Sequence, residues 1–198
     1  MHISVYVMGL EHAILVSLAE KSASGYELTR RFGRSIGFFW EATHQQIYRT
    51  LARMTETGWV TYDVIEQPDR PDKKVYRISD GGQAELARWL AEPLERPADR
   101  DGLAVKIRGA SLGDLPAVIS EIERHRAMHA ERLETYRTIE KRDFPDPAAL
   151  SGRALHQYLV LRGGIRTEQG RLDWCDEALE ALRADNSPDQ ADTNRRSE

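Results

Sequence analysis

Between Thr43 and Trp59 the chain reads THQQIYRTLARMTETGW, with one polar and one apolar stripe. The polar side chains have hydrogen-bonding chemistry suited to base edges. Gln45 can offer a paired donor and acceptor to adenine, and Arg49 can bridge the two acceptors of guanine. A face that meets only solvent would more often carry Glu and Lys, although taken alone the stripe still favours that plainer interpretation. Its members are His44, Gln45, Gln46, Tyr48, Arg49 and Arg53.

The ends of this segment predict a helix that begins at His44. Thr43 and Gln46 match the capping box T-x-x-Q, and Gly58 follows as an expected left-handed C-cap. Because Gln46 is expected to bind its own backbone, it is less free to read a base. The stronger candidate readers are His44, Gln45, Tyr48 and Arg49. The buried stripe, spaced by four and three residues, is Ile47, Leu51 and Met54.

Two further helices are expected before this segment. The first runs from Leu10 to Ala19 and carries apolar residues on one face. The second begins after Ser24, which forms an S-x-x-E capping box with Glu27.

A hairpin and a fourth helix are expected after the polar segment. Alternating β-forming residues predict strands at 60–65 and 73–78, joined by a charged turn. Ser79 is expected to cap the fourth helix, which Pro93 ends. The residues expected to face inward are Leu86, Trp89 and Leu90.

Three helices followed by a hairpin are the element order of a winged helix-turn-helix, whose third helix lies in the DNA major groove. Basic residues at the hairpin tip would hold the DNA backbone without reading sequence. A winged helix that binds protein instead is the alternative, because fold alone does not fix function. The predicted DNA-binding residues are Thr43, His44, Gln45, Gln46, Tyr48, Arg49, Arg53, Arg70, Lys73 and Lys74.

Beyond the hairpin and its helix the chain is expected to be almost entirely helical. Apolar residues seven apart in two long helices indicate heptad seams. Two such seams exceed what one small helical pair can bury, so a second copy of the chain is expected as partner. The predicted dimer seam comprises Leu115, Val118, Ile122, His125, His129, Tyr158, Leu161, Ile165, Leu172, Cys175, Leu179 and Leu182.

The predicted fold is therefore mainly α: a winged helix-turn-helix with a small β-hairpin wing, and a coiled-coil-like helical dimerisation domain. The DNA-binding domain is expected at 1–92 and a linker at 93–101. The helical domain, with a possible effector site, is expected at 102–183. The tail at 184–198 has almost no apolar residue and is predicted to be disordered.

Composition narrows the class of protein. The formal net charge of −4 means that any surface for nucleic acid must be locally basic. The N-terminus lacks a signal-peptide pattern, and no apolar run is long enough to span a bilayer, so a cytoplasmic protein without membrane contact is expected. No catalytic assembly emerges, and an enzyme is not expected.

Three residues of the helical region are candidate chemical sites. His125 and His129 are four residues apart, a spacing that lets two imidazoles share a metal. No further Cys or His completes a ligand set, so no metal or cofactor is predicted and both are expected to be polar seam residues. Cys175 is expected to be inert packing, with an interchain disulfide across a twofold axis as the alternative.

Several segments resemble known regulators. GYEL opens the second helix, IYRTLARM lies in the third and YRISDGG follows the wing, as in the N-terminal domain of the PadR family of transcriptional regulators. After Asp101, VKIRGAS and YLVLRGGIRTEQGRLDWCDEAL are similar to the virulence-activator-alpha type C-terminal domain.

The resemblance implies a homodimer built by the C-terminal helices, with one winged helix per subunit on a double-stranded, pseudo-palindromic operator. It also implies repression that ends when a small aromatic or hydrophobic effector binds in or near the dimer interface. Commoner members have small residues where His44 to Gln46 stand, which implies a different operator for this chain.

Overall fold

The computed structural model describes residues 5–33, 42–68, 72–94 and 101–185. The chain divides into two compact units, Met1–Arg96 and Pro97–Glu198, each with a buried cluster of its own. Arg70, most of the expected linker and most of the expected disordered tail lie outside the described residues.

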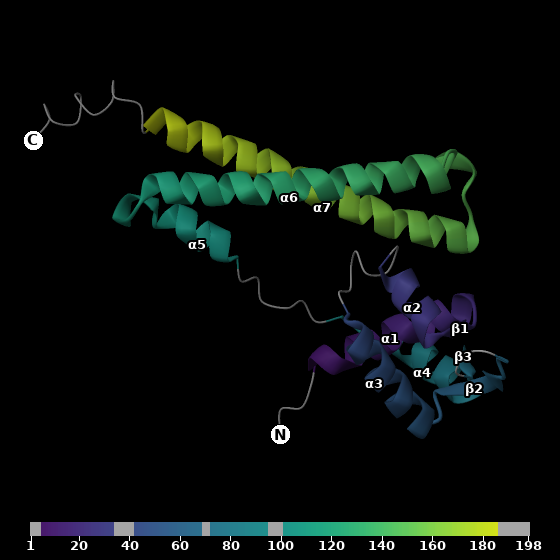
Figure 1. The fold of residues 1–198 in the computed structure, drawn as a ribbon. Coiled ribbons are helices and arrows are strands. Elements are labelled where there is room, and N and C mark those ends of the chain that lie inside the picture. The colour runs from purple at the N-terminus through teal and green to yellow at the C-terminus, as the bar shows by residue number, and fades with distance from the viewer. Residues whose placement is uncertain (1–4, 34–41, 69–71, 95–100, 186–198) are drawn as a thin grey trace, which may run out of the picture. The chain divides into compact units, whose positions relative to one another are not determined.

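The first unit combines helices with a small sheet (Figure 1). Its described helices are α1 (Val5–Glu20), α2 (Gly25–Phe32), α3 (His44–Glu56) and α4 (Asp80–Ala91). Its strands are β1 (Ala23–Ser24), β2 (Val60–Ile65) and β3 (Lys73–Ile78). The predicted strands at 60–65 and 73–78 are confirmed, as is the start of α3 at His44.

The sheet has the order β1-β3-β2, with both pairings antiparallel. β1 was not predicted from the sequence, since a strand of two residues is too short to show alternation. It nevertheless matters, because Ser24 pairs with Val75 and joins the start of α2 to the hairpin.

The helix caps predicted at Ser24 and Ser79 are confirmed. The Glu27 carboxylate accepts from the Ser24 amide at 2.8 Å, and the Ser24 hydroxyl accepts from the Glu27 amide at 3.3 Å. The Ser79 side chain likewise accepts from the amide of Gly82 at the start of α4. After α3, Gly58 has a φ of 75°, the left-handed conformation that glycine adopts without strain.

The core of the first unit is assembled from all four helices and the sheet. The prediction that Leu90 faces inward is wrong, because its side chain is 66% exposed. Leu86 and Trp89 face inward as predicted, together with Gly82, and Leu90 lies about 100° further round the helix than Trp89. The buried apolar residues are Leu10, Ile14, Leu15, Leu18, Ala23, Leu28, Phe32, Ile47, Leu51, Met54, Val60 and Tyr76.

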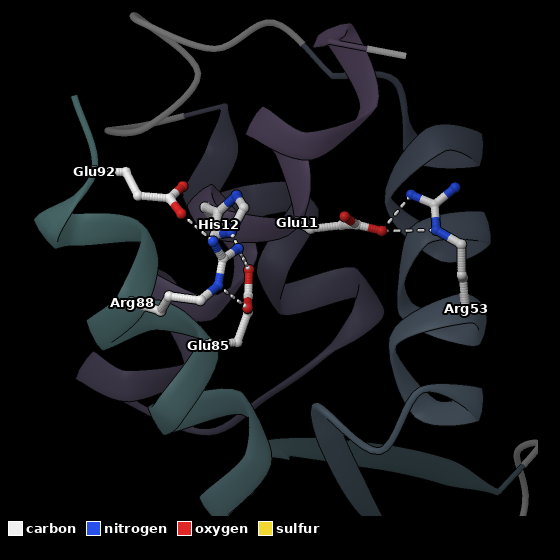
Figure 2. A network of polar contacts seen from close by, with 6 residues as sticks. All are labelled: Glu11, His12, Arg53, Glu85, Arg88 and Glu92. Atoms are coloured by element: carbon white, nitrogen blue, oxygen red, sulfur yellow. Dashed lines mark hydrogen bonds and ion pairs between the residues drawn. The ribbon is translucent and has the colours of Figure 1, made fainter. Parts of the chain in front are cut away.

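Two adjacent residues of α1 connect it to the helices on either side (Figure 2). Glu11 accepts from Nε of Arg53 on α3 at 2.7 Å. His12 is completely buried, with Nε2 lying 3.0 Å from Oε1 of Glu85 on α4 and its ring stacked on Trp89 at 4.5 Å. These contacts fix α3 and α4 against the same helix.

The second unit is built around two long helices that lie side by side (Figure 1). They are α6 (Leu115–Asp143) and α7 (Gly152–Asp185), and α5 (Gly102–Arg108) packs against α6. A short 3-10 turn, η2 (Ala110–Leu112), lies between α5 and α6, and another, η3 (Pro147–Ala149), lies between α6 and α7. The helices expected from the heptad patterns are therefore present.

Much of the predicted dimer seam is covered within one chain. α6 and α7 bury each other's apolar stripes, so a second copy is not needed to explain why these positions are apolar. The buried seam residues are Ile122, Leu161, Ile165, Cys175 and Leu179. The half-buried ones are Leu115, Val118, His125, His129, Tyr158, Leu172 and Leu182.

The polar residues that interrupt the apolar heptad positions lie beside charged partners within the same unit. Glu168 on α7 is buried, and its Oε2 lies 2.6 Å from Nδ1 of His129 on α6. Its other oxygen lies 3.5 Å from the Arg132 guanidinium. His125 lies 3.5 Å from Glu121, one turn away. A buried carboxylate without such partners would strongly destabilise the pair of helices.

The Glu85 network predicts acid sensitivity of the first unit. Hydrogen bonds from Arg88 and, more weakly, from His12 hold the pKa of Glu85 at about 2, against about 4.3 in an unfolded chain. Its contribution to stability is complete above the unfolded pKa and is lost as the pH falls towards the folded one. We predict that Glu85→Gln removes part of the fall in unfolding free energy between about pH 5 and about pH 2. Denaturant titrations at each pH measure this fall, and identical pH profiles for the two proteins would contradict the assignment.

Cys175 is predicted to be unreactive in the folded protein. Its side chain is completely buried between α5, α6 and α7, and burial raises the pKa of the thiol. Only the thiolate reacts readily. Alkylation by iodoacetamide should therefore be slow in buffer and fast in denaturant. Rapid labelling of the native protein, or a disulfide-linked dimer on a non-reducing gel after mild oxidation, would show that the thiol is accessible.

Candidate nucleic-acid interface and ligand groove

The rotation of α3 about its axis decides which side chains reach a partner. Ile47, Leu51 and Met54 have no exposed surface, because they form part of the core of the first unit. The opposite face is open. It exposes the predicted readers His44, Gln45, Gln46, Tyr48 and Arg49 together on one surface.

The first turn of α3 is closed by Thr43 and Gln46, as predicted. The Thr43 amide donates to Oε1 of Gln46 at 2.8 Å, and the Gln46 amide donates to the Thr43 hydroxyl at 3.2 Å. The carboxamide oxygen of Gln46 is thereby occupied. A bidentate contact with adenine needs both the oxygen and the NH₂ group, so Gln45 is the better placed of the two glutamines.

Two aromatic side chains form a stack on the exposed face. The rings of His44 and Tyr48, one helical turn apart, have centroids 4.4 Å apart and an interplanar angle of 28°. Tyr48 is 41% exposed. The stack restricts the rotamers of both side chains, which remain exposed on this face.

Arg49 and Gln45 are polar side chains of this face without a described intramolecular partner. Neither forms an ion pair or a side-chain hydrogen bond with another residue that the structure describes. Both are exposed. A guanidinium without an intramolecular carboxylate can make a bidentate contact with guanine without first giving up a bond.

Arg53, predicted to meet DNA, instead takes part in a bond within the unit. Its guanidinium is paired with Glu11, whose side chain is only 10% exposed (Figure 2). A phosphate that bound the Nε and Nη2 edge of the guanidinium would leave that carboxylate without its partner. The sequence did not reveal this pair because its members are 42 residues apart.

The hairpin presents fewer free cations than its sequence indicates. Nζ of Lys73 lies 3.0 Å from Oε1 of Glu27 on α2. Lys74 stays exposed, with Nζ 4.4 Å from the centroid of the Tyr62 ring. Of the predicted wing cations that the structure describes, Lys74 is therefore the one available to a phosphate.

Glu27 has two partners at the junction of α2 and the wing. Hydrogen bonds from the Ser24 amide and from Lys73 hold the pKa of Glu27 at about 2. The carboxylate is therefore ionised at neutral pH. It caps α2 and fixes one wing lysine at the same time.

A groove of about 510 Å³ lies between α5, α6 and α7 of the second unit. Ion pairs bridge it: Asp101 with Arg171, and Lys106 with Glu121 at 3.5 Å. Within the described part of the chain no three His, Cys, Asp or Glu side chains are placed to hold a metal ion. The side chains around it include Lys106, His125, Met128, His129, Arg171 and Trp174.

None of the described helices is both long and apolar enough to cross a membrane.

Comparison with known proteins identifies both units. The model of the PadR-like family of transcriptional regulators matches residues 14–88, and that of the virulence activator alpha C-terminal domain matches residues 100–183. A probable transcriptional regulator of Mycobacterium tuberculosis is 58% identical over 185 residues, which cover 88% of this chain and 98% of that protein.

Solved structures share this architecture. The virulence activator AphA of Vibrio cholerae has a TM-score of 0.76 and 32% identity, covering 88% of this chain and 98% of that one. PadR of Bacillus subtilis, named a negative transcriptional regulator, in complex with operator DNA has a TM-score of 0.75 and 27% identity, covering 87% and 98%. The same protein has been solved with p-coumaric acid, at a TM-score of 0.73, 26% identity and coverage of 88% and 98%.

The relatives are regulators of transcription and not enzymes, in agreement with the expectation from the sequence. The segments GYEL, IYRTLARM and YRISDGG fall within the matched N-terminal region, and the two C-terminal segments fall within the second match. The chain belongs to the PadR-like family of transcriptional regulators, and its C-terminal unit is of the virulence-activator-alpha type.

Proposed function

We propose that this protein is a homodimeric, sequence-specific DNA-binding regulator that acts in the cytoplasm and represses transcription until a small effector binds. The observation that carries the proposal is the rotation of α3. A fully buried stripe of three residues directs His44, Gln45, Tyr48 and Arg49 outward together. Their donors and acceptors match those of the major groove.

The proposal assigns different tasks to different residues of the first unit. Gln45 and Arg49 read base edges, and the His44–Tyr48 stack contacts a base or the backbone. Lys74 holds phosphate without reading sequence. Arg53 and Lys73 keep α3 and the wing in place through Glu11 and Glu27.

A dimer provides the geometry for a pseudo-palindromic operator. Two recognition helices reach successive major-groove faces when they lie about one helical turn apart, roughly 34 Å. The half-buried residues of α6 and α7 are the proposed source of the interface, because they keep apolar surface that one chain does not cover. Bound at a promoter, such a dimer represses by excluding polymerase.

The groove of the second unit is the proposed effector site. Trp174 and Met128 can contact an aromatic ring. Lys106 can bind a carboxylate if it gives up its 3.5 Å pair with Glu121. The structure of Bacillus subtilis PadR has been solved with p-coumaric acid, which carries an aromatic ring and a carboxylate. Release of DNA then follows if the effector changes the spacing of the two recognition helices.

A winged-helix adaptor that binds only protein is the alternative function. It predicts no sequence preference and little salt dependence, whereas each phosphate contact with DNA releases counterions and gives a steep dependence on salt.

The DNA assignment predicts that Arg49→Ala weakens binding to the protein's own upstream DNA about tenfold or more, since one bidentate base contact is lost. Its unfolding midpoint should stay at the wild-type value, because Arg49 has no described partner to lose. Fluorescence anisotropy at several salt concentrations measures the binding, and circular dichroism measures the midpoint.

Two arginines serve as controls for this experiment. Arg166→Ala removes an equal charge from an exposed position of α7 and should leave affinity unchanged. Arg53→Ala should lower the unfolding midpoint, because it leaves the buried Glu11 unpaired. No binding of wild type at low salt, with or without effector, would count against DNA recognition altogether.

The effector assignment predicts that an aromatic carboxylic acid, tested first as p-coumaric acid, quenches the fluorescence of Trp174 and lowers operator affinity over the same concentration range. The Trp174→Phe variant identifies that signal among the four tryptophans. Release of DNA without any change in Trp174 fluorescence would place the effector outside the groove.

A further inference from the structure

Gly25, the first residue of α2, lies directly against the exposed face of α3. A Cβ built at this position would stand 2.5 Å from Cζ of Tyr48 and 2.9 Å from its hydroxyl oxygen. Both distances are far below van der Waals contact. The Tyr48 ring therefore occupies the space that any side chain at position 25 would need.

The backbone at Gly25 is held from both sides and has little freedom to yield. The preceding residue, Ser24, pairs with Val75 of the sheet and takes part in the capping box with Glu27. The carbonyl of Gly25 itself accepts from the Thr29 hydroxyl at 2.9 Å. A side chain added here would consequently displace the partner and not the backbone.

Tyr48 is the partner that can move. Its side chain is 41% exposed and is held by the stack on His44 and by the surface at Gly25. Turning the ring away from Gly25 would remove it from the imidazole. Both side chains would then have to be ordered again when DNA binds, which lowers affinity.

We infer that Gly25 is a positioning residue for DNA recognition: the missing side chain lets the Tyr48 ring lie on α2, which sets the orientation of the His44–Tyr48 stack on the reading face of α3. The inference rests on the proposed DNA binding. It concerns the specificity of reading, while Gly25 itself touches no base.

The test introduces Gly25→Ala into three backgrounds: wild type, Tyr48→Phe and Tyr48→Ala. The readout is the ratio of affinities for the protein's own upstream DNA and for unrelated DNA of equal length. In wild type and in Tyr48→Phe, which keeps the ring, Gly25→Ala should lower this ratio by roughly tenfold, the effect of one lost base contact. In Tyr48→Ala, which has no ring to displace, Gly25→Ala should leave the ratio unchanged.

Thermal unfolding supplies a readout that needs no DNA. Alanine suits the first turn of a helix, so Gly25→Ala should raise the unfolding midpoint in the Tyr48→Ala background, where the three nearest atoms are gone. In wild type the gain should be absent or reversed. Equal shifts in both backgrounds would show that Gly25 and Tyr48 do not act on each other, and would overturn the inference whatever the DNA results.

The DNA results separate the two claims. If wild type does not distinguish its upstream DNA from unrelated DNA, the proposed function fails, and the unfolding measurements still decide the contact. If wild type distinguishes them but Gly25→Ala lowers the ratio equally with and without the Tyr48 ring, the inference is overturned and the proposed function stands.

Discussion

Burial of one stripe of α3 is the constraint on which the rest of the first unit depends. Ile47, Leu51 and Met54 have no exposed surface, so the helix cannot turn about its axis without opening the core. The position of every outward side chain follows from that rotation. Surrounding contacts then add detail: the capping box fixes where the helix begins, and Glu11 holds its last turns through Arg53.

The polar contacts around α3 divide its side chains into those with intramolecular partners and those without. Gln46 and Arg53 are bound within the unit, whereas Gln45 and Arg49 have no described partner. The same division holds in the wing, where Glu27 binds Lys73 and Lys74 stays exposed. The basic residues of such a domain are therefore not equivalent, and counting them would overestimate its contacts with phosphate.

Local signals made most of the fold predictable from the sequence. Both capping boxes, the glycine after α3 and the alternating strands depend on residues within a few positions of each other. The pairs that were missed are distant in sequence: Arg53 with Glu11 by 42 residues, Lys73 with Glu27 by 46, and His129 with Glu168 by 39. The heptads predicted the long helices correctly, but periodicity does not say whether a seam meets a helix of the same chain or of another. It was the fold that showed α6 and α7 covering each other.

The most direct test of the account is a methylation-interference experiment on the upstream DNA with full-length protein. The account places α3 in the major groove, where N7 of guanine lies. Methylation of guanine N7 should block binding in two half-sites about one helical turn apart, and Arg49→Ala should remove the interference at one guanine in each half-site. Interference confined to adenine N3 in the minor groove, or a guanine pattern that Arg49→Ala leaves unchanged, would contradict the claim that this face of α3 reads the operator.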